Sequence, residues 1–439
     1  MPYSQNNTDL FCTVSYTWPC TSVLSLSGMT MISVFTPSHD PKYLDECYKS
    51  LQEQTNSNWE WVVLLNGEAI WERPNDDRVK VGYAKPQIKG VGALKREAVS
   101  RCTGDILLEL DHDDILLPTA LMDVEYVFDN FSDIGFVYSD TAQIKSDGKP
   151  DDSEFDPAHG WKYYHEDGYK GALSFEPYPH NLSYIWYAPN HLRAFRKAVY
   201  DQIGGYQANL EVLDDQDIMS RMYQATKFYH IPEILYLQRV HPDNTQTVRN
   251  AEIQTGTVEL YHQTVERNAV AWSKHEGLLA LDLGAHHNKA EGFLGVDLRP
   301  GVGVDYVGDI FDMDIADDSV GVIRAHDFME HVENKVAFME WCYDKLAHGG
   351  MLLSMTPSSD GRGAYQDPTH VAYWNENSFW YHTDKTYSDF IDGRVRFQVS
   401  CLRSFFPSKW HHDNHIPYVQ ANLIAVKSTT HDFGGILNI

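Results

Sequence analysis

Short apolar runs alternate with helix-length stretches along most of the chain, and this rhythm constrains the fold more than any other feature. Residues 31–38, 59–67 and 105–111 have the pattern of strands, and residues 41–55 and 90–102 have the pattern of helices between them. Strands that alternate with helices in this way are typical of a parallel sheet covered by helices. The sequence therefore predicts an α/β fold.

This rhythm is interrupted twice before it starts again. Residues 145–189 are rich in Tyr, His, Pro, Gly and Asp and show little periodicity, so we expect a loop-like region that covers a substrate. Residues 250–274 have the pattern of an amphipathic helix. Its candidate core positions are Ile253, Val258, Leu260 and Val265. Strand-like runs resume at residue 277, which indicates a second α/β unit.

The length of 439 residues is too great for one ordinary core. We expect a first domain over residues 29–250, a helical connector over 251–275 and a second domain over 276–439. Residues 1–28 contain no Lys or Arg, so they lack the basic region of a secretion signal. We interpret them as a poorly ordered N-terminal extension.

The composition limits the partners of the chain. It has 62 acidic and 35 basic residues and a formal charge of -27, which would repel nucleic acid and anionic lipid. Its six cysteines lack metal-ligand spacing and suit a reducing compartment. No apolar run approaches the roughly 18 residues of a membrane helix. We expect a cytoplasmic protein without a transmembrane segment.

Three aspartates, Asp111, Asp113 and Asp114, follow the third predicted strand directly. Carboxylates this close raise one another's pKa unless a cation or solvent lies among them. Ligands of an open α/β sheet bind at the carboxyl ends of its strands, where Asp111 and Asp113 could reach one site. Such oxygen ligands suit Mg²⁺ or Mn²⁺ bridging a diphosphate, although a solvated acidic turn would have the same spacing.

Six motifs in order place these aspartates in a wider pattern: VFTPSHD, VVLLNGE, GALKREA, LELDHDD, IGGY…LDDQDIMSR and LQRVHPDNT. Together they resemble the GT-A-fold glycosyltransferases of family 2 over roughly residues 31–250. The resemblance implies a Rossmann-like fold and inverting transfer of a sugar from a nucleotide-diphosphate donor, commonly UDP-linked, to a glycan acceptor. A sugar nucleotidyltransferase would need a Gly-rich basic loop after the first strand, and FTPSHDPKYL contains none.

The same resemblance implies which residues bind the donor. Thr36 and Pro37 would line the nucleotide site, and Asn66 would stand where the family usually has an Asp facing the base. Lys95 would occupy the position of a common Arg. These two substitutions leave the base preference open.

The metal site is implied in the same way. Asp113 would be the main protein ligand of Mn²⁺ or Mg²⁺, and Asp111 would face the ribose and the metal. His241 resembles the late histidine of the family near the metal and the diphosphate. A bound metal would act as a Lewis acid on the departing diphosphate.

The segment LDDQD carries the second chemical signal of this half. Inverting transfer needs a carboxylate that takes the proton of the acceptor hydroxyl. The family usually has Glu-Asp here with the Asp as base, and this chain has Asp214 and Asp215. We therefore assign Asp215 as the base and keep Asp217 as the second candidate. Acidic residues also gather at helix N-termini to match the helix dipole, but the neighbouring motifs favour the catalytic interpretation.

The second half contains the segments LLALDLGAHHNKAEGFLGVDL, DYVGDIFDMDIADDSVGVIRAHDFMEHV, GGMLLSMTPS and YQDPTHVAYWN. Over about residues 277–427 they resemble class I S-adenosylmethionine-dependent methyltransferases, which implies a second Rossmann-like domain. Asp282 and Gly284 match the start of the motif acidic-x-Gly-x-Gly-x-Gly. Asp297 matches the ribose-binding acid, and Asp309 matches a residue near the adenine.

This second half departs from the family pattern where close backbone approach is needed. His286 and Asn288 replace the second and third glycines, and a side chain there could obstruct the methionine moiety. Three interpretations stay open: an active methyltransferase with a reshaped loop, a cofactor-binding domain without activity, or a scaffold.

Two histidine-containing motifs of this half are less specific. Glu330 with His331, and Asp367 with His370, could line an acceptor pocket, but helix capping and turn chemistry explain them equally well. The histidines of KWHHDNHIPY have no Cys or Glu at metal-ligand spacing, so we expect a loop there.

Taken together, the sequence predicts a metal-dependent inverting hexosyltransferase with a C-terminal domain that could methylate the glycan. A methylated sugar cannot be extended at the blocked hydroxyl, so the fusion makes chemical sense. The alternatives are a non-catalytic scaffold that binds glycan or nucleotide, and an active glycosyltransferase with a degenerate methyltransferase domain.

Overall fold

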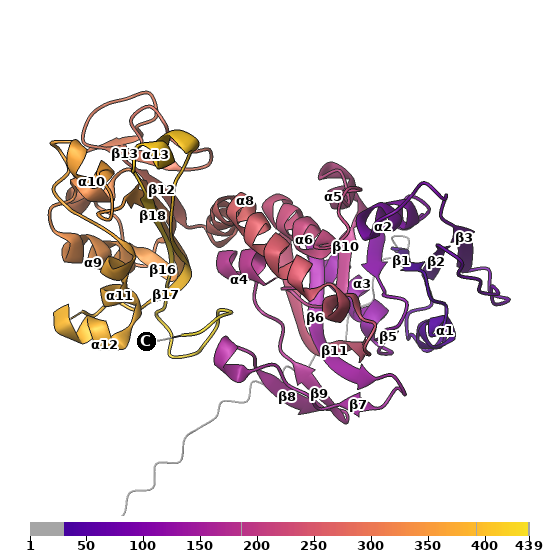
Figure 1. Ribbon diagram of the computed structural model, residues 1–439. Coiled ribbons are helices and arrows are strands. Elements are labelled where there is room, and N and C mark those ends of the chain that lie inside the picture. Colours follow the sequence, from indigo (N-terminus) through magenta and orange to yellow (C-terminus); the bar gives the residue numbers. More distant parts are fainter. Residues whose placement is uncertain (1–29, 186, 392, 438–439) are drawn as a thin grey trace, which may run out of the picture.

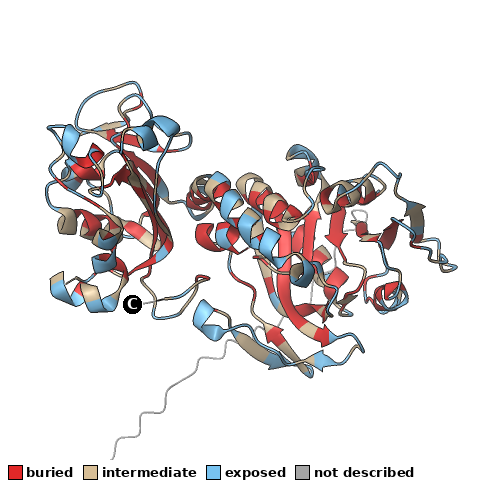
Figure 2. Ribbon diagram, viewed as in Figure 1, coloured by how far each residue is buried: buried red, intermediate tan, exposed pale blue. Residues whose placement is uncertain are grey.

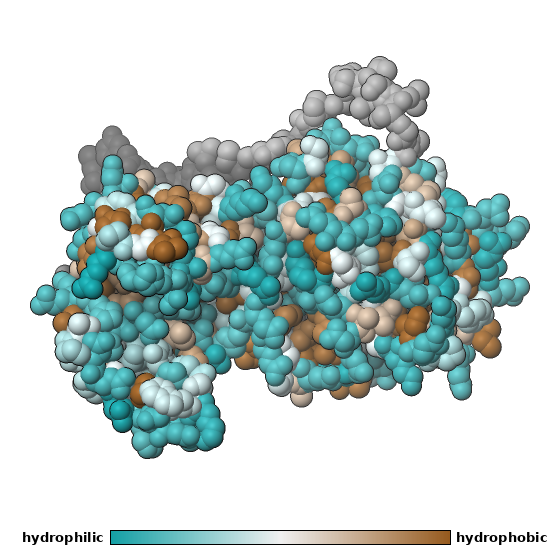
Figure 3. All heavy atoms as spheres, turned by 90° about the horizontal axis from the view of Figure 1, so that it is seen from above, coloured by the Kyte–Doolittle hydropathy of each residue, from teal (hydrophilic) through white to brown (hydrophobic). Residues whose placement is uncertain are grey.

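The computed structural model describes residues 30–185, 187–391 and 393–437, so the expected extension over residues 1–28 lies outside the described part (Figure 1). Two mixed sheets, each flanked by helices, lie on either side of the long helix α8 (Asn250–Glu276) (Figure 1). Buried residues concentrate in the two sheets and in the faces of the helices that cover them (Figure 2). The outer face seen from above is mostly hydrophilic, with apolar residues in small groups (Figure 3).

The path through the N-terminal sheet has the order β3-β2-β1-β4-β10-β6-β11-β5. Its strands are β1 (Ile32–Ser38), β2 (Trp59–Leu65), β3 (Val79–Tyr83), β4 (Ile106–Glu109), β5 (Ile115–Leu116), β6 (Ile134–Lys145), β10 (Arg193–Arg196) and β11 (Lys227–Val240). The first four strands of the path are parallel, and β10 runs antiparallel between β4 and β6. Every residue of β2 is buried, as expected of a parallel strand covered on both faces.

Helices cover this sheet and connect its strands. They are α1 (Leu44–Gln52), α2 (Val91–Val99), α3 (Ala120–Asn130), α5 (Lys197–Gln202), α6 (Asp214–Ala225) and α7 (Thr245–Val248). Leu44, Cys47 and Leu51 of α1 are buried at helical spacing, so one face of α1 packs on the sheet.

The region over residues 145–189 has more regular structure than its composition suggested. It contains β7 (Pro150–Asp151), β8 (Tyr163–Glu166), β9 (Tyr169–Ala172) and α4 (Pro179–Tyr184). Asp167 and Gly168 join β8 to β9 with φ angles of 49° and 86°, the left-handed backbone of a tight hairpin turn. Because β8 carries only intermediate and exposed residues, it lacks the apolar alternation that would have revealed it.

The C-terminal sheet has the order β14-β13-β12-β15-β16-β18-β17. Its strands are β12 (Leu279–Leu283), β13 (Leu294–Asp297), β14 (Tyr306–Val307), β15 (Val320–His326), β16 (Leu346–Pro357), β17 (Phe397–Phe405) and β18 (Tyr418–Ala425). The first five strands of the order are parallel, and β18 is antiparallel to both of its neighbours. The order reverses between β12 and β15, which is where sheets of this kind bind ligands.

The helices of this half are α9 (Lys335–Lys345), α10 (Gly363–Gln366), α11 (Glu376–Thr383), α12 (Lys385–Ser388) and α13 (Lys409–Asp413). The helix α13 lies where a loop was expected, and the Ser408 side chain caps it by accepting a hydrogen bond from the His411 amide. Among the described residues, no helix is both long enough and apolar enough to cross a membrane.

The two halves contact each other through α4, α8 and the C-terminal segment. The helix α8 packs on α4 and α6 on one side and on β12, β15 and β16 on the other. The Asn181 side chain accepts a hydrogen bond from the Gly434 amide at 2.9 Å and donates one to the Asp432 carbonyl at 3.0 Å. His180 bonds Ser400 and the Gly434 carbonyl at 2.8 and 2.7 Å. The C-terminal segment therefore ties the second half to α4 of the first.

Candidate active site

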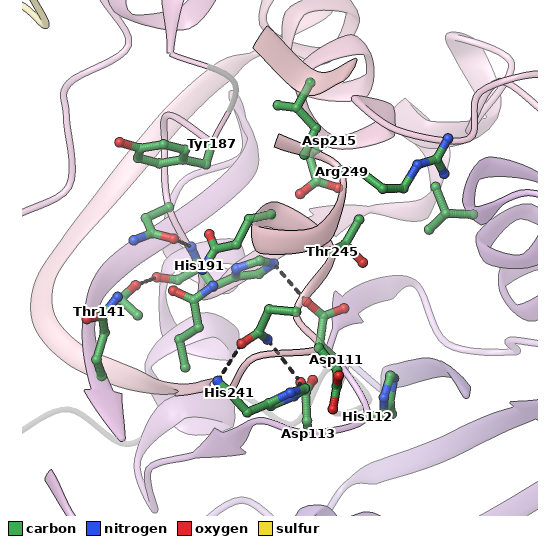
Figure 4. Close-up of a pocket in the computed structure, with 18 of the residues that line it drawn as sticks. Asp111, His112, Asp113, Thr141, Tyr187, His191, Asp215, His241, Thr245 and Arg249 are labelled. Atoms are coloured by element: carbon green, nitrogen blue, oxygen red, sulfur yellow. Dashed lines mark hydrogen bonds and ion pairs between the residues drawn. The ribbon is translucent and has the colours of Figure 1, made fainter. Parts of the chain in front are cut away.

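A cavity of about 700 Å³ opens at the carboxyl edge of the N-terminal sheet. Its walls include the segments after β1 and β4, the insertion between β6 and β10, the start of α6 and the chain after β11. Most of the residues predicted for donor, metal and catalysis line it: Pro37, Asn66, Lys95, Asp111, Asp113, Asp215 and His241. In the view of Figure 4, Asp111, Asp113 and His241 lie together, and Asp215 lies with Arg249 across the cavity from them.

Thr36 is the one predicted donor residue of this half that does not line the cavity. It is fully buried in β1, where its hydroxyl donates to the Leu110 carbonyl at 2.7 Å. The same hydroxyl accepts a hydrogen bond from the Trp61 indole at 2.9 Å. Its side chain therefore belongs to the core, and it positions the strand rather than facing a ligand.

Asp113 and His241 form the centre of the candidate metal site. The Asp113 carboxylate and His241 Nε2 are 2.8 Å apart, and the Asn244 side-chain amide donates to the same carboxylate oxygen at 3.4 Å. Asn244 also accepts the His241 amide at 2.6 Å, so it orients both groups. A carboxylate beside an imidazole is a donor set that suits Mn²⁺, and a predominantly oxygen set suits Mg²⁺.

The other two aspartates of the acidic turn have different roles. Although 39% of the Asp111 side chain is exposed to the cavity, burial and then the charge of Glu109 raise its pKa to about 8. Asp114 is turned away from the cavity, and its carboxylate accepts the Arg239 amide at 2.7 Å. Two carboxylates of the turn are therefore available to a ligand, and the third holds the turn against β11.

A buried cluster of charges surrounds the candidate base. The Lys95 ammonium forms ion pairs with Glu109, with Asp214 at 2.6 Å and with Asp215 at 2.8 Å. The Arg193 guanidinium contacts the second oxygen of Asp215 at 2.6 Å. The three carboxylates lie close enough together to hold a metal ion. The Lys95 ammonium already lies among them, so it provides the positive charge that a metal would otherwise supply.

The cluster separates the protonation of its two neighbouring aspartates. Burial raises the pKa of Asp215, but the charges of Lys95 and Arg193 outweigh this and hold it well below its usual range. Burial raises the pKa of Asp214 to about 7, in spite of Lys95. Asp215 is therefore ionised at neutral pH, as a proton acceptor must be, whereas Asp214 holds its proton more tightly than an ordinary aspartate.

Asp215 is better placed for catalysis than Asp217. Its side chain is 18% exposed and lines the cavity at the first turn of α6. The Asp217 carboxylate pairs with Arg221 at 3.0 Å and does not line the cavity. Leu213, directly before α6, has a φ of 61°, a strained conformation for a bulky residue of the kind found at functional sites.

Two residues of the site carried no predicted role. Arg193 lies in β10 opposite Glu109 of β4. Its position between apolar residues in the sequence was the one signal that could have indicated a buried arginine with an acidic partner. Asn244 stands in the turn HPDN after β11, where an Asn is ordinarily explained by turn formation.

The insertion contributes a cluster of aromatic rings to the cavity wall. Trp161 stacks against both Phe155 and Tyr187, with ring centroids 4.8 and 5.4 Å away, and these two rings are 6.4 Å from each other. Tyr163 stacks on the same indole at 6.4 Å. This part of the cavity is flat and apolar, in contrast to the charged walls around Asp113 and Asp215.

The residues predicted to bind S-adenosylmethionine lie along the carboxyl side of the C-terminal sheet. Asp282 is buried in β12, and its carboxylate contacts Arg324 at 2.9 Å and accepts the Ala290 amide at 2.8 Å. Asp297, at the end of β13, accepts the Arg299 amide at 2.9 Å. Each of these carboxylates is thus engaged within the chain.

The other positions predicted for this cofactor are in turns. Gly284 follows β12 with a φ of 74°, and the Asp309 carboxylate accepts the Phe311 amide at 3.0 Å at the start of a short 3₁₀ helix. His286 has a φ of 25°, in the left-handed region, and its carbonyl accepts the Gly303 amide at 2.9 Å. Hydrogen bonds within the chain therefore fix the loop at the expected methionine site in its conformation.

Comparisons with known proteins find similarity in the first half of the chain. Residues 33–203 match the model of glycosyl transferase family 2. Chondroitin synthase of Escherichia coli is 23% identical over 239 residues, which cover 52% of this chain and 32% of that protein. The O-antigen biosynthesis protein RfbC of Myxococcus xanthus is 25% identical over 54% of this chain and 18% of its own length.

A solved structure, S. aureus TarS 1-349 in complex with UDP-GlcNAc, has a TM-score of 0.40 and 14% identity over 56% of this chain and 71% of that chain. The chain spans about a third or less of the length of the two curated relatives named above. The family match covers β2, β4, the acidic turn and Arg193, and it ends before Asp215, β11 and His241. The findings thus support a glycosyl transferase family 2 match for residues 33–203, which is less than half of the chain.

Proposed function

We propose that the chain is a metal-dependent inverting glycosyltransferase that moves a hexose from a nucleotide-diphosphate donor, with UDP as the first candidate, to a glycan acceptor. One observation carries the proposal. A single cavity brings a metal-type donor set, Asp113 with His241, to one wall and an ionised carboxylate, Asp215, to another. Direct displacement at a sugar carbon needs both groups, one for the leaving diphosphate and one for the attacking hydroxyl.

The donor would bind between the ends of β1, β2 and β4. Pro37 and Asn66 line this part of the cavity, and Asp111 and Asp113 follow β4. Asp113, His241 and Asp111 would hold Mn²⁺ or Mg²⁺, which when bound supplies positive charge to the departing diphosphate.

Asp215 would take the proton from the acceptor hydroxyl while the hydroxyl oxygen attacks the anomeric carbon. Lys95 and Arg193 keep Asp215 ionised and fix both of its oxygens in place. The same two cations lower its basicity, so the base acts through position more than through proton affinity. A single displacement leaves no covalent bond between sugar and protein, and the configuration at the sugar carbon inverts.

The acceptor would lie against the aromatic cluster of the insertion. Flat rings such as Trp161 and Tyr187 present apolar surface that complements the C–H faces of a sugar ring. The names of the relatives, chondroitin synthase and an O-antigen biosynthesis protein, also favour a glycan as the product.

For the C-terminal half we propose an S-adenosylmethionine site that serves methylation of the same glycan. The support is the position of Gly284, Asp297 and Asp309 after successive strands beside the reversal of strand order. A specific observation favours the alternative of a degenerate methyltransferase domain. His286 closes its own loop through Gly303, and Asp282 already pairs with Arg324.

The first test is thermal unfolding of the full chain with UDP, GDP, dTDP or CDP, each with and without Mn²⁺. A ligand at a hundred times its dissociation constant stabilises the folded state by about 2.7 kcal/mol, which gives a visible shift. We expect a Mn²⁺-dependent shift with one nucleotide, lost in Asp113→Asn and kept in Asp217→Asn. If a well-folded sample shows no shift with any of the four, the non-catalytic scaffold replaces the enzyme.

A further inference from the structure

A second cavity, of about 260 Å³, lies at the carboxyl edge of the C-terminal sheet. Glu330, His331 and His370 stand in its wall, and their ligand atoms all lie within 4.8 Å of one another. Among the described residues that line this cavity there is no lysine or arginine. The group thus differs from the carboxylates around Lys95, where an ammonium already supplies the positive charge.

The two histidines present the same nitrogen to the group. His331 Nδ1 lies 3.2 Å from the Thr369 carbonyl, and His370 Nδ1 lies 3.1 Å from the Ala364 carbonyl. A carbonyl oxygen only accepts, and the Thr369 hydroxyl, also 3.2 Å from His331 Nδ1, donates its own proton to Asp367. Each Nδ1 therefore carries the proton and each Nε2 keeps its lone pair. Metal-binding histidines usually have this arrangement, with the second ring nitrogen donating to a carbonyl or carboxylate.

Glu330 supplies the carboxylate and joins the two segments of the group. Its side chain accepts the Thr356 hydroxyl at 2.7 Å through one oxygen, and the residue is only 2% exposed. Its backbone carbonyl accepts both the Val371 and Ala372 amides at 2.9 Å, which holds the loop of His370 against the turn of Glu330.

The charge of Glu330 is not balanced by a basic side chain. Among the described residues, the Thr356 hydroxyl donates to this carboxylate, and no lysine or arginine is among the groups that act on it. A buried carboxylate without a compensating charge is costly, and a bound cation would remove that cost.

We propose that Glu330, His331 and His370 bind a divalent transition-metal ion of the zinc class, with one coordination position open to the cavity. A carboxylate with two imidazoles is a common three-residue zinc set, and the fourth position then takes water or an oxygen of a ligand. Coordination at about 2.0–2.2 Å draws the three groups closer together, and His331, which is exposed, has room to rotate. The site is separate from the Asp113 site in position and in ligand preference, because imidazoles favour zinc and oxygen favours Mg²⁺ or Mn²⁺.

The test is a calorimetric titration of the full chain with Zn²⁺ after dialysis against a chelator. We expect one tight site per chain, and at least about tenfold weaker binding in His331→Ala, His370→Ala and Glu330→Gln. His331→Ala is the decisive variant because its side chain is exposed and its loss leaves the core intact. Thermal unfolding in chelator checks that each variant is folded. Titration with Co²⁺ adds a visible absorption band for nitrogen-ligated tetrahedral metal, which the same variants should lose.

Two controls separate this site from other metal sites. His412→Ala removes an exposed histidine that does not line the cavity, which matters in a chain with 21 histidines, and should leave the site unchanged. Asp113→Asn removes the main ligand of the first site and should also leave zinc binding unchanged. Zinc binding that persists in both His331→Ala and His370→Ala, or that is lost in Asp113→Asn, would overturn the proposal.

Discussion

The carboxyl edges of the two sheets hold acidic residues at comparable places but use them differently. In the first sheet, Asp111 and Asp113 line a cavity, and the buried Lys95 forms an ion pair with Asp215. In the second sheet, Asp282 pairs with Arg324 and its other oxygen accepts a backbone amide. A strand end determines where a carboxylate lies, whereas its neighbours decide whether a ligand can reach it.

At the edge of the C-terminal sheet, the side chains that could bind a metal ion are not those of Asp282 and its neighbours. Glu330, His331 and His370 line a cavity beside the segments that follow β15 and β16, and the glycine-containing loop after β12 does not contribute to its wall. The resemblance to methyltransferases favours a ligand site at that loop, whereas the grouping of a carboxylate with two imidazoles favours a metal site in this cavity. The two edges therefore need separate tests.

The largest effect is expected at the first edge, in catalysis. Asp215→Asn removes the proposed proton acceptor, so the turnover number should fall about 10²–10⁴-fold while nucleotide binding is retained. Steady-state transfer assays and nucleotide titration measure the two quantities. Asp217→Asn is the matched control, because Asp217 pairs with Arg221 outside the cavity. Full turnover in Asp215→Asn would assign the base to another residue.

The second effect compares the buried cations of the two edges. Lys95→Met leaves three carboxylates without their shared cation, and we expect a loss of about 3–5 kcal/mol in the free energy of unfolding. Arg324→Met should cost less, about 1–3 kcal/mol, since Arg324 is 21% exposed and Asp282 keeps the Ala290 amide. Urea unfolding of the full chain measures both. Equal losses in the free energy of unfolding would show that the buried cation contributes as much to stability at the second edge as at the first.

The sequence predicted the parts of this comparison that depend on local pattern. The strands β1, β2 and β4 were found because a parallel strand buried on both faces is a continuous apolar run. In α8 the same reasoning was half wrong, since Ile253 is buried but Val258 is 57% exposed. The buried stripe of this helix contains polar residues such as Asn268, which a hydrophobic pattern does not reveal.

Partners distant in sequence explain the rest of what was missed. Lys95 lines the cavity as expected of a donor residue, but its ion pairs with Glu109 and Asp214 were not predicted, since no spacing within one motif shows that three segments meet there. Thr36 was expected in the nucleotide site, but its hydroxyl is used by Leu110 and Trp61. Motifs located the edge of the sheet, and only the packing decides which side chains face the cavity.

The third effect is on the free energy of unfolding, which depends on pH in opposite directions through His230 in the first half and His326 in the second. Although burial lowers the pKa of His230, hydrogen bonds to Asp140 and Glu176 raise it to about 9. Burial, and then the charge of Arg324, lowers the pKa of His326 to about 3. The stabilisation by His230, about 3 kcal/mol, is complete below the unfolded pKa of about 6.5 and is lost as the pH rises through 9. The stabilisation associated with neutral His326 is present above about pH 6.5 and is lost as the pH falls toward 3.

Urea unfolding of the full chain between pH 5 and 9.5 checks both directions. His230→Gln should flatten the alkaline part of the curve, and His326→Gln should flatten the acidic part. A His230→Gln curve parallel to that of the unmodified chain would mean that this ion-pair network does not set the alkaline limit.

The smallest expected effect concerns the loop after β12. His286→Gly removes a left-handed strain of about 1 kcal/mol and the side chain at the expected methionine position, so S-adenosylmethionine should bind up to about tenfold more tightly. Calorimetric titration of both forms measures this, with His287→Ala, its exposed neighbour, as the control. Tighter binding in the glycine variant alone would mean that the second edge retains a cofactor site narrowed by one side chain. Absence of binding in every form would assign the C-terminal half to the scaffold interpretation, because the acids of that edge would then serve only the contacts they already make.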